Sequence, residues 1–180
     1  MRIYVASSWR NDIQPDVVKA LRAAGHEVYD FKNPREGDKG FHWSEIDKDW
    51  KQWAPEKYRE CLNHPVACAG FKSDFDAMEW AECFVGVQPF GRSASMEMGY
   101  GAASGKLTIL LLNSGEPELM VKMFDHICCS LGEVIEIVGS VEDELDDEYP
   151  EPGPPACYGQ GDYACGSEEC DFCQFEDTCG

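Results

Sequence analysis

Carboxylates stand on both sides of a short apolar run, and paired carboxylates are the side chains that cleave glycosidic bonds. Asp74 and Asp76 precede the run at residues 84–87, and Glu97 follows it. In that chemistry one carboxyl group protonates the leaving group, while the other attacks the sugar carbon or stabilises its positive charge. Burial and mutual repulsion would separate the two pKa values and so divide the roles. Each acid also has a structural interpretation, because carboxylates near helix N-termini stabilise the helix.

Two loops carry hydroxyl and cationic groups suited to a small anion. The first is Tyr4-Val-Ala-Ser-Ser-Trp-Arg-Asn11, in which the candidate binding residues are Ser7, Ser8 and Arg10. The second opens the segment Gly91-Arg-Ser-Ala-Ser-Met-Glu-Met-Gly-Tyr-Gly101, where a helix N-terminus would favour an anion, and its candidates are Gly91, Arg92, Ser93 and Ser95. Arg10 has the alternative of an ordinary surface charge. Neither loop has the glycine pattern of a Rossmann dehydrogenase or a Walker ATPase.

The elements that must position these residues alternate between strand and helix along residues 1–140. Apolar runs predict strands, and helical spacings predict helices. The predicted strands cover residues 3–6, 27–31, 84–87, 107–112 and 134–138, and the predicted helices cover 16–24, 73–82, 95–104 and 117–128. Strands that are apolar on both faces and alternate with helices indicate a parallel sheet covered on both sides. We therefore predict an α/β fold with a five-stranded, parallel, doubly wound (flavodoxin-like) sheet, whose ligand lies beyond the carboxyl ends of the strands.

Residues 33–69 interrupt this alternation. The segment contains a predicted helix at 55–62 and is rich in aromatic residues, namely Phe41, His42, Trp43, Trp50, Trp53 and Tyr58. One interpretation is a lid whose rings stack on a flat ligand. The simpler interpretation is that the rings pack this insertion onto the domain.

Three motifs in this order resemble the nucleoside 2-deoxyribosyltransferase superfamily, which includes the 2'-deoxynucleoside 5'-phosphate N-hydrolases. They are Tyr4 with Ser7-Ser-Trp-Arg10, then Asp74-x-x-x-Met-x-x-Ala-Glu82, then Gly-Arg-Ser-Ala-Ser-Met-Glu97-Met-Gly-Tyr. The resemblance covers residues 1–140 apart from the aromatic insertion. It implies that Glu97 is the nucleophile at C1' of the sugar, that Asp74 binds the sugar or helps to protonate the base, and that Tyr4 lies near the nucleophile. It also implies a homodimer or larger homo-oligomer.

The resemblance implies cleavage of the N-glycosidic bond of a nucleoside or nucleoside 5'-monophosphate, with the sugar passed to water or to another base. No metal or organic cofactor is needed for this reaction. Where transferases of the family tend to carry an acid before the nucleophile, this chain has Gly91-Arg92-Ser93, which favours a 5'-phosphate, as does Arg10. Two alternatives stay open. One is hydrolysis of NAD or another N-ribosyl compound on a similar fold, and the other is a non-catalytic nucleotide-binding or interaction protein.

The composition of the chain indicates which kinds of molecule it can bind. The chain has 180 residues and 43% hydrophobic residues, enough for a core, and its formal net charge is −19. Such a surface repels phosphate polymers and anionic membranes, so we expect a small-molecule ligand rather than nucleic acid or a membrane. No apolar run approaches a membrane span, and the N-terminus lacks the apolar stretch of a signal peptide. We expect a cytoplasmic protein.

Residues 141–180 form a tail of different composition. It holds thirteen acidic residues, no Lys or Arg, and half of the ten cysteines, namely Cys157, Cys165, Cys170, Cys173 and Cys179. Four of these thiolates could hold Zn²⁺, and an iron–sulfur cluster is the alternative. A disordered acidic tail with free thiols is equally consistent with the composition.

Overall fold

The structure is a computed structural model and describes residues 1–113 and 117–148. The chain divides into two compact units, Met1–Glu142 and Asp143–Gly180, and all five strands belong to the first. The predicted metal-binding cysteines of the tail lie outside the described residues. No helix among the described residues is long and apolar enough to cross a membrane.

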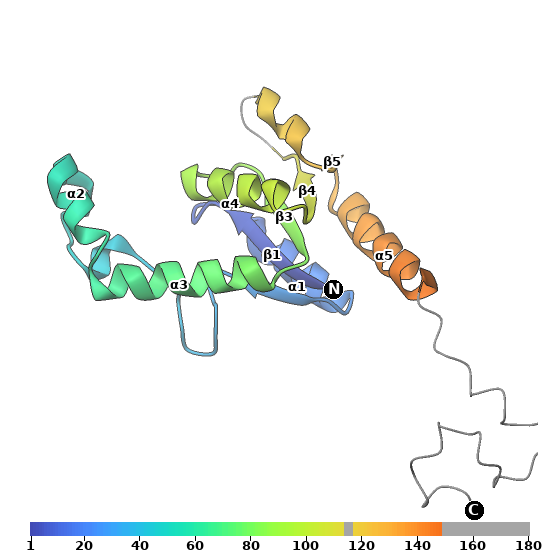
Figure 1. Cartoon of the computed structure of the whole chain (residues 1–180), viewed down its shortest axis with the longest axis horizontal. Helices are drawn as coiled ribbons and strands as arrows, with labels where there is room; N and C mark the ends of the chain where they lie inside the picture. The colour runs from blue at the N-terminus through green and yellow to red at the C-terminus, as the bar shows by residue number, and fades with distance from the viewer. Residues whose placement is uncertain (114–116, 149–180) are drawn as a thin grey trace, which may run out of the picture. The chain divides into compact units, whose positions relative to one another are not determined.

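A five-stranded parallel sheet forms the centre of the first unit, in the order β2-β1-β3-β4-β5 (Figure 1). Its strands are β1 (Arg2–Ser7), β2 (Glu27–Asp30), β3 (Cys83–Val87), β4 (Leu107–Leu111) and β5 (His126–Cys128). This is the flavodoxin-like order, and it confirms the predicted fold class. The strand order reverses between β1 and β3, so a crevice is expected beyond their carboxyl ends.

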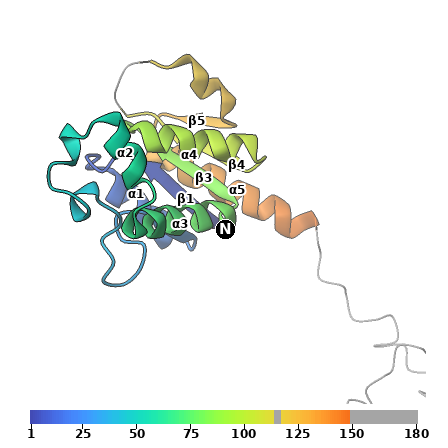
Figure 2. The same cartoon turned by 60° about the vertical axis from the view of Figure 1, so that its left-hand side comes forward.

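Helices cover both faces of the sheet (Figures 1 and 2). On one face, α1 (Gln14–Ala23) and α5 (Leu131–Glu148) pack with their apolar residues against the aliphatic side chains of the strands. On the other face, α3 (Pro65–Trp80) and α4 (Arg92–Ala103) pack on a core built around Tyr4 and Phe84, both with 0% exposed surface. The two helices that carry the candidate acids therefore share one face of the sheet.

Two element predictions near the C-terminal end of the domain are wrong. Residues 134–138 form part of helix α5 rather than a strand, and the fifth strand is β5, inside the predicted helix 117–128. Val134 and Val138 lie one helical turn apart and are both 0% exposed against the sheet. Their β-branched side chains favour a strand locally, but burial of a helical face outweighs that propensity.

Helix α3 begins at Pro65 rather than at residue 73. Its N-cap is His64, whose Nδ1 accepts a hydrogen bond from the backbone N–H of Val66 at 3.3 Å. Asp74 and Asp76 consequently lie within the helix and not at its N-terminus. The structural interpretation of these two acids as partners of a helix N-terminus is therefore wrong.

The aromatic insertion is built from two short 3₁₀ turns, η1 (Trp43–Glu45) and η2 (Trp50–Gln52), and from α2 (Pro55–Cys61), which confirms the predicted helix 55–62. In Figure 1, α3 extends beyond the sheet, and α2 lies at its far end. The rings of Phe41, Trp53 and Tyr58 each contact Trp43 edge-on, with centroids 4.8 to 5.7 Å apart. The insertion thus has a small aromatic core of its own.

A close approach at Gly70 seats the insertion on α3. A Cβ atom on Gly70 would lie 2.7 Å from Cβ and 2.8 Å from Cγ of Phe41. Only a residue without a side chain allows the Phe41 ring to lie this close to the helix.

Asn11 ties the carboxyl ends of β1 and β3 together. Its Nδ2 donates hydrogen bonds to Ser7 Oγ at 2.9 Å and to the Val87 carbonyl oxygen at 3.0 Å, and Ser7 Oγ donates to the same carbonyl at 2.8 Å. Asn11 is only 3% exposed, so these are buried bonds that are costly to break. The tie fixes the crevice between the two strands.

We predict that Gly70→Ala lowers the free energy of unfolding by about 1 kcal/mol, because the overlap with Phe41 outweighs the gain in helix propensity. The matched control is Gly99→Ala in α4, where a Cβ meets no atom within 4 Å, so this change should raise stability by about 0.5–1 kcal/mol. Urea unfolding of both variants measures the difference. Equal stabilisation by the two substitutions would contradict the close approach.

Candidate active site

A cavity of about 650 Å³ lies at the carboxyl ends of β1 and β3, where the strand order reverses. Five parts of the chain contribute to its wall: the end of β1 with the loop after it, Phe31 directly after β2, the aromatic insertion, helix α3 and helix α4. The lining residues are Ser7, Trp9, Arg10, Phe31, Phe41, His42, Trp43, Trp50, Lys51, Leu62, Ala67, Cys68, Phe71, Asp74, Ser93 and Glu97. A partly enclosed, aromatic-walled space with a few polar groups is typical of a small-molecule site.

Glu97 enters the cavity from the second turn of α4. The helix is held against β3 by Met98, which is 0% exposed, and by Gly101, where a Cβ would lie 2.8 Å from Phe84 Cγ. Burial raises the pKa of Glu97 to about 7, and the negative charge of Asp74 adds to the increase, while the Tyr4 hydroxyl opposes it. Near neutral pH this carboxyl group therefore populates both its acid and its base form.

Asp74 enters the same cavity from α3. The hydroxyl of Tyr29 donates a hydrogen bond of 2.8 Å to Asp74 Oδ1. Burial raises the pKa of Asp74, the bond from Tyr29 opposes this, and the charge of Asp38 adds to the increase. Asp74 also lines a second cavity of about 290 Å³, on the side of α3 where Asp38 lies.

Tyr4 lies beneath the two acids in the middle of β1. Its ring stacks between Tyr29 of β2 and Phe84 of β3, with centroid distances of 5.4 and 5.2 Å. The hydroxyl is buried and no hydrogen-bond partner lies within reach among the described residues, although it interacts with Glu97 more loosely. Burial, followed by the charges of Glu97 and Asp74, raises the pKa of Tyr4, so the group stays a neutral donor. A donor in this position is available to the carboxylate of Glu97 or to a ligand.

The structure brings together only some of the predicted binding residues. Ser7, Arg10 and Ser93 line the cavity with the two acids, whereas Ser8, Gly91, Arg92 and Ser95 do not. Ser95 Oγ donates back to the Gly91 carbonyl oxygen at 3.2 Å, and Ser8 Oγ accepts from the Arg10 N–H at 3.2 Å, which places both hydroxyls in local caps and turns.

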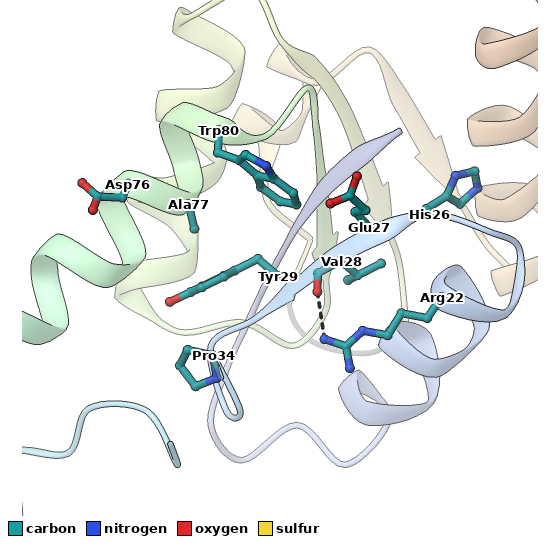
Figure 3. A pocket seen from close by; sticks show the side chains of 9 residues that line it. All are labelled: Arg22, His26, Glu27, Val28, Tyr29, Pro34, Asp76, Ala77 and Trp80. Carbon is teal, nitrogen blue, oxygen red and sulfur yellow. Dashed lines mark hydrogen bonds between the residues drawn. The ribbon is translucent and has the colours of Figure 1, made fainter. Parts of the chain in front are cut away.

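Asp76 lies apart from Asp74, although only one residue separates them. Two positions along an α-helix correspond to about 200° of rotation, so the side chains leave α3 in different directions. Asp76 is exposed, forms an ion pair of 2.7 Å with Lys72, and borders a separate groove of about 620 Å³ beside β2 (Figure 3).

Three polar residues of the site carry no signal in the sequence motifs. Lys51 lines the cavity from η2, Tyr29 binds Asp74 from β2, and Asp38 acts on Asp74 from the loop before the aromatic turns. Tyr29 of β2 pairs with Tyr4 of β1 in the parallel sheet. Only knowledge of this strand register would have placed Tyr29 at the site. Among the side chains that the structure describes, in residues 1–113 and 117–141, no three from His, Cys, Asp or Glu converge in a way that could hold a metal ion.

Several solved structures resemble the chain, including the following two. A 2-deoxyribosyltransferase from the psychrotolerant bacterium Bacillus psychrosaccharolyticus is 23% identical, with a TM-score of 0.49 over 75% of this chain and 90% of that chain. A CMP N-glycosidase from Clostridium botulinum is 17% identical, with a TM-score of 0.44 over 77% of this chain and 99% of that chain. No protein-family model matches the chain, and no curated protein matches it.

The raised pKa of Glu97 predicts a pH-dependent stability. Glu97 is protonated in both folded and unfolded chains well below its ordinary pKa, but above pH 7 the fold must bury its charge. Glu97→Gln removes that cost, so the variant should gain about 1–3 kcal/mol over the parent chain at pH 8 and much less at pH 4. Urea unfolding at the two pH values measures this gain. The control is Glu79→Gln, which changes an exposed glutamate of α3. If Glu97→Gln changed the free energy of unfolding by the same amount at pH 4 and at pH 8, the burial of the Glu97 charge would be contradicted.

Proposed function

We propose that the protein cleaves the N-glycosidic bond of a nucleoside 5'-monophosphate, with Glu97 as nucleophile and Asp74 as proton donor to the leaving base. The observation that carries this proposal is the convergence of two carboxyl groups with raised pKa values on one aromatic-walled cavity. The order and spacing of the three sequence motifs support it.

The reaction uses the two carboxyl groups in different protonation states. The ionised Glu97 carboxylate attacks C1' of the sugar, the bond from C1' to the base nitrogen breaks, and its electron pair leaves with the base. Asp74 in its acid form supplies a proton to the base as that bond breaks. Water then attacks C1' of the glycosyl-enzyme and gives a proton to the Asp74 carboxylate, while the bond from C1' to the Glu97 oxygen breaks and releases the sugar phosphate and the Glu97 carboxylate. If a second base takes the place of water, the outcome is transfer.

The aromatic wall supplies a binding surface for the base. Trp9 contacts His42 with ring centroids 4.2 Å apart and contacts Phe31 at 5.1 Å, so these rings hold one another in place. Flat aromatic side chains stabilise a nucleobase by stacking, at about 1–3 kcal/mol per base. Six of the lining residues are aromatic rings contributed by the loop after β1, the insertion and α3, namely Trp9, Phe41, His42, Trp43, Trp50 and Phe71.

The cationic residues of the cavity supply a site for the 5'-phosphate. Arg10 and Lys51 line it, although acids exceed bases by 34 to 15 in the whole chain. Ser93 adds a hydroxyl in the first turn of α4, where the helix N-terminus favours an anion. Two positive charges in one cavity of an acidic protein are explained by an anionic substrate.

We predict that the purified protein releases a free base from at least one nucleoside 5'-monophosphate, and that Glu97→Gln lowers kcat/KM at least about 1000-fold. Liquid chromatography with mass spectrometry would follow base, sugar and any exchanged nucleoside, with NAD and free nucleosides in the same panel. Because the reaction needs an ionised Glu97 and a protonated Asp74, kcat/KM should follow a bell-shaped pH profile, displaced toward neutral pH by the raised pKa values of the two groups.

The control is Glu79→Gln, which changes an exposed glutamate of α3 and should leave turnover unaltered. If NAD were the one compound of the panel that is cleaved, releasing nicotinamide, the substrate would be an N-ribosyl compound other than a nucleoside 5'-monophosphate. Binding without any turnover, or full activity of Glu97→Gln, would refute the proposed reaction.

Loss of either cation should weaken the discrimination between nucleotide and nucleoside. We expect Arg10→Ala and Lys51→Ala each to raise KM for the 5'-monophosphate about tenfold and to leave KM for the nucleoside within about twofold, because a charge-assisted hydrogen bond contributes about 1.5–3 kcal/mol. Steady-state kinetics on both substrates measures the ratio. Lys48→Ala, an exposed lysine of the insertion outside the cavity, is the matched control. An equal loss for both substrates would exclude a phosphate site.

A further inference from the structure

Two tyrosines stand side by side beneath the two acids. Tyr4 of β1 and Tyr29 of β2 are direct partners in the parallel register, and their rings stack at 5.4 Å with an interplanar angle of 15°. The Tyr4 hydroxyl interacts with Glu97, and the Tyr29 hydroxyl donates to Asp74 Oδ1. Each carboxyl group of the site is thus approached from the sheet by one phenol.

We propose that Tyr29 is a positioning residue for the proton donor: its hydroxyl holds Asp74 Oδ1, so that the other oxygen, Oδ2, is the one that delivers the proton in the cavity. This inference rests on the proposed function, since it assigns the orientation of the group that protonates the leaving base. The three sequence motifs do not include Tyr29.

The hydrogen bonds around Asp74 support this orientation. Tyr29 Oη lies 2.8 Å from Asp74 Oδ1 and 3.1 Å from the hydroxyl of Ser73, the preceding residue of α3. Within the described residues, no hydrogen bond is made to Oδ2. One oxygen of the carboxyl group is therefore anchored, and the other is open to exchange a proton.

The Tyr29 side chain is itself fixed from two sides. Its ring stacks on Tyr4 and packs against the core under α3 and α4. Figure 3 shows the side chain reaching from β2 toward α3, near Ala77 and Trp80 at the separate groove beside the sheet edge. A hydroxyl on a ring held in this way can hold the carboxyl group with little loss of further side-chain entropy.

Several other charged and titratable groups line the two cavities that Asp74 borders. They come from every part of the chain that borders its two cavities: Arg10 after β1, Arg35, Asp38, His42, Glu45 and Lys51 in the insertion, and Glu97 in α4. Burial raises the pKa of Asp74 most, and the hydrogen bond from Tyr29 lowers it. Of the groups named, the charge of Asp38 adds to the increase. Removing the Tyr29 hydroxyl should therefore raise the pKa of Asp74 further, because the ionised form loses a donor.

Tyr29→Phe keeps the ring and removes only the hydroxyl. We expect kcat to fall about tenfold with KM within about twofold, since the proton donor loses its orientation but the binding surface remains. The limb of the pH profile that Asp74 sets should move to higher pH, because the loss of the hydroxyl donor raises the pKa of Asp74. Tyr100→Phe is the control, because its ring also packs beside Phe84 on the same face of the sheet.

A second measurement does not depend on turnover. Titration of ¹³C-labelled aspartate carboxyl groups by NMR, with Asp74→Asn to assign the signal, should show a higher pKa for Asp74 in Tyr29→Phe than in the parent chain. If the parent chain releases base and Tyr29→Phe has the same kcat and pH profile, the positioning role is refuted. If the parent chain releases no base, the proposed function fails, and an unchanged titration of Asp74 in the variant would also refute the bond from Tyr29.

Discussion

Two carboxyl groups held in one partly closed cavity are the constraint on which the rest of the structure depends. Burial disfavours the charge of both Asp74 and Glu97, and the charge of Asp74 further raises the pKa of Glu97. Two buried carboxyl groups repel each other when both are charged, so they stay close only if rigid elements hold them. Here Asp74 lies on α3 and Glu97 lies on α4, and both helices pack on the same face of the sheet. The row of rings formed by Tyr29, Tyr4 and Phe84 crosses three strands beneath these helices and fixes where they lie.

Most of the fold could be predicted from the sequence, because β1, β3 and β4 are largely apolar and buried, and because α1 and α4 follow β1 and β3 after short loops. The prediction failed where one pattern fits two structures. Val134-Ile-Glu-Ile-Val138 alternates like a strand, and it also places Val134 and Val138 on one helical face, which the sheet buries. The true fifth strand, β5, has only three residues, too few for any periodicity to reveal it.

The site residues that could be predicted from the sequence are those that directly follow a predicted strand. Glu97 and Ser93 follow β3, and Arg10 follows β1, so the parallel sheet brings them to one edge. Tyr29 and Lys51 escape such reasoning because their places depend on strand register and on the path of the insertion. Local spacing says nothing of either.

The acids of the proposed reaction and the wall of the cavity come from different parts of the chain, and two ring contacts join these parts. The acids come from α3 and α4, whereas much of the cavity wall comes from the insertion, which is seated by Phe41 on Gly70 and by His42 on Trp9. This division also reconciles a net charge of −19 with the anionic substrate that we propose. Salt at physiological strength screens charges beyond about 8 Å, so the acidic surface repels a nucleotide only weakly at a distance, while the cation on the insertion acts at contact. The insertion therefore provides, at short range, an attraction that the acidic surface as a whole cannot provide.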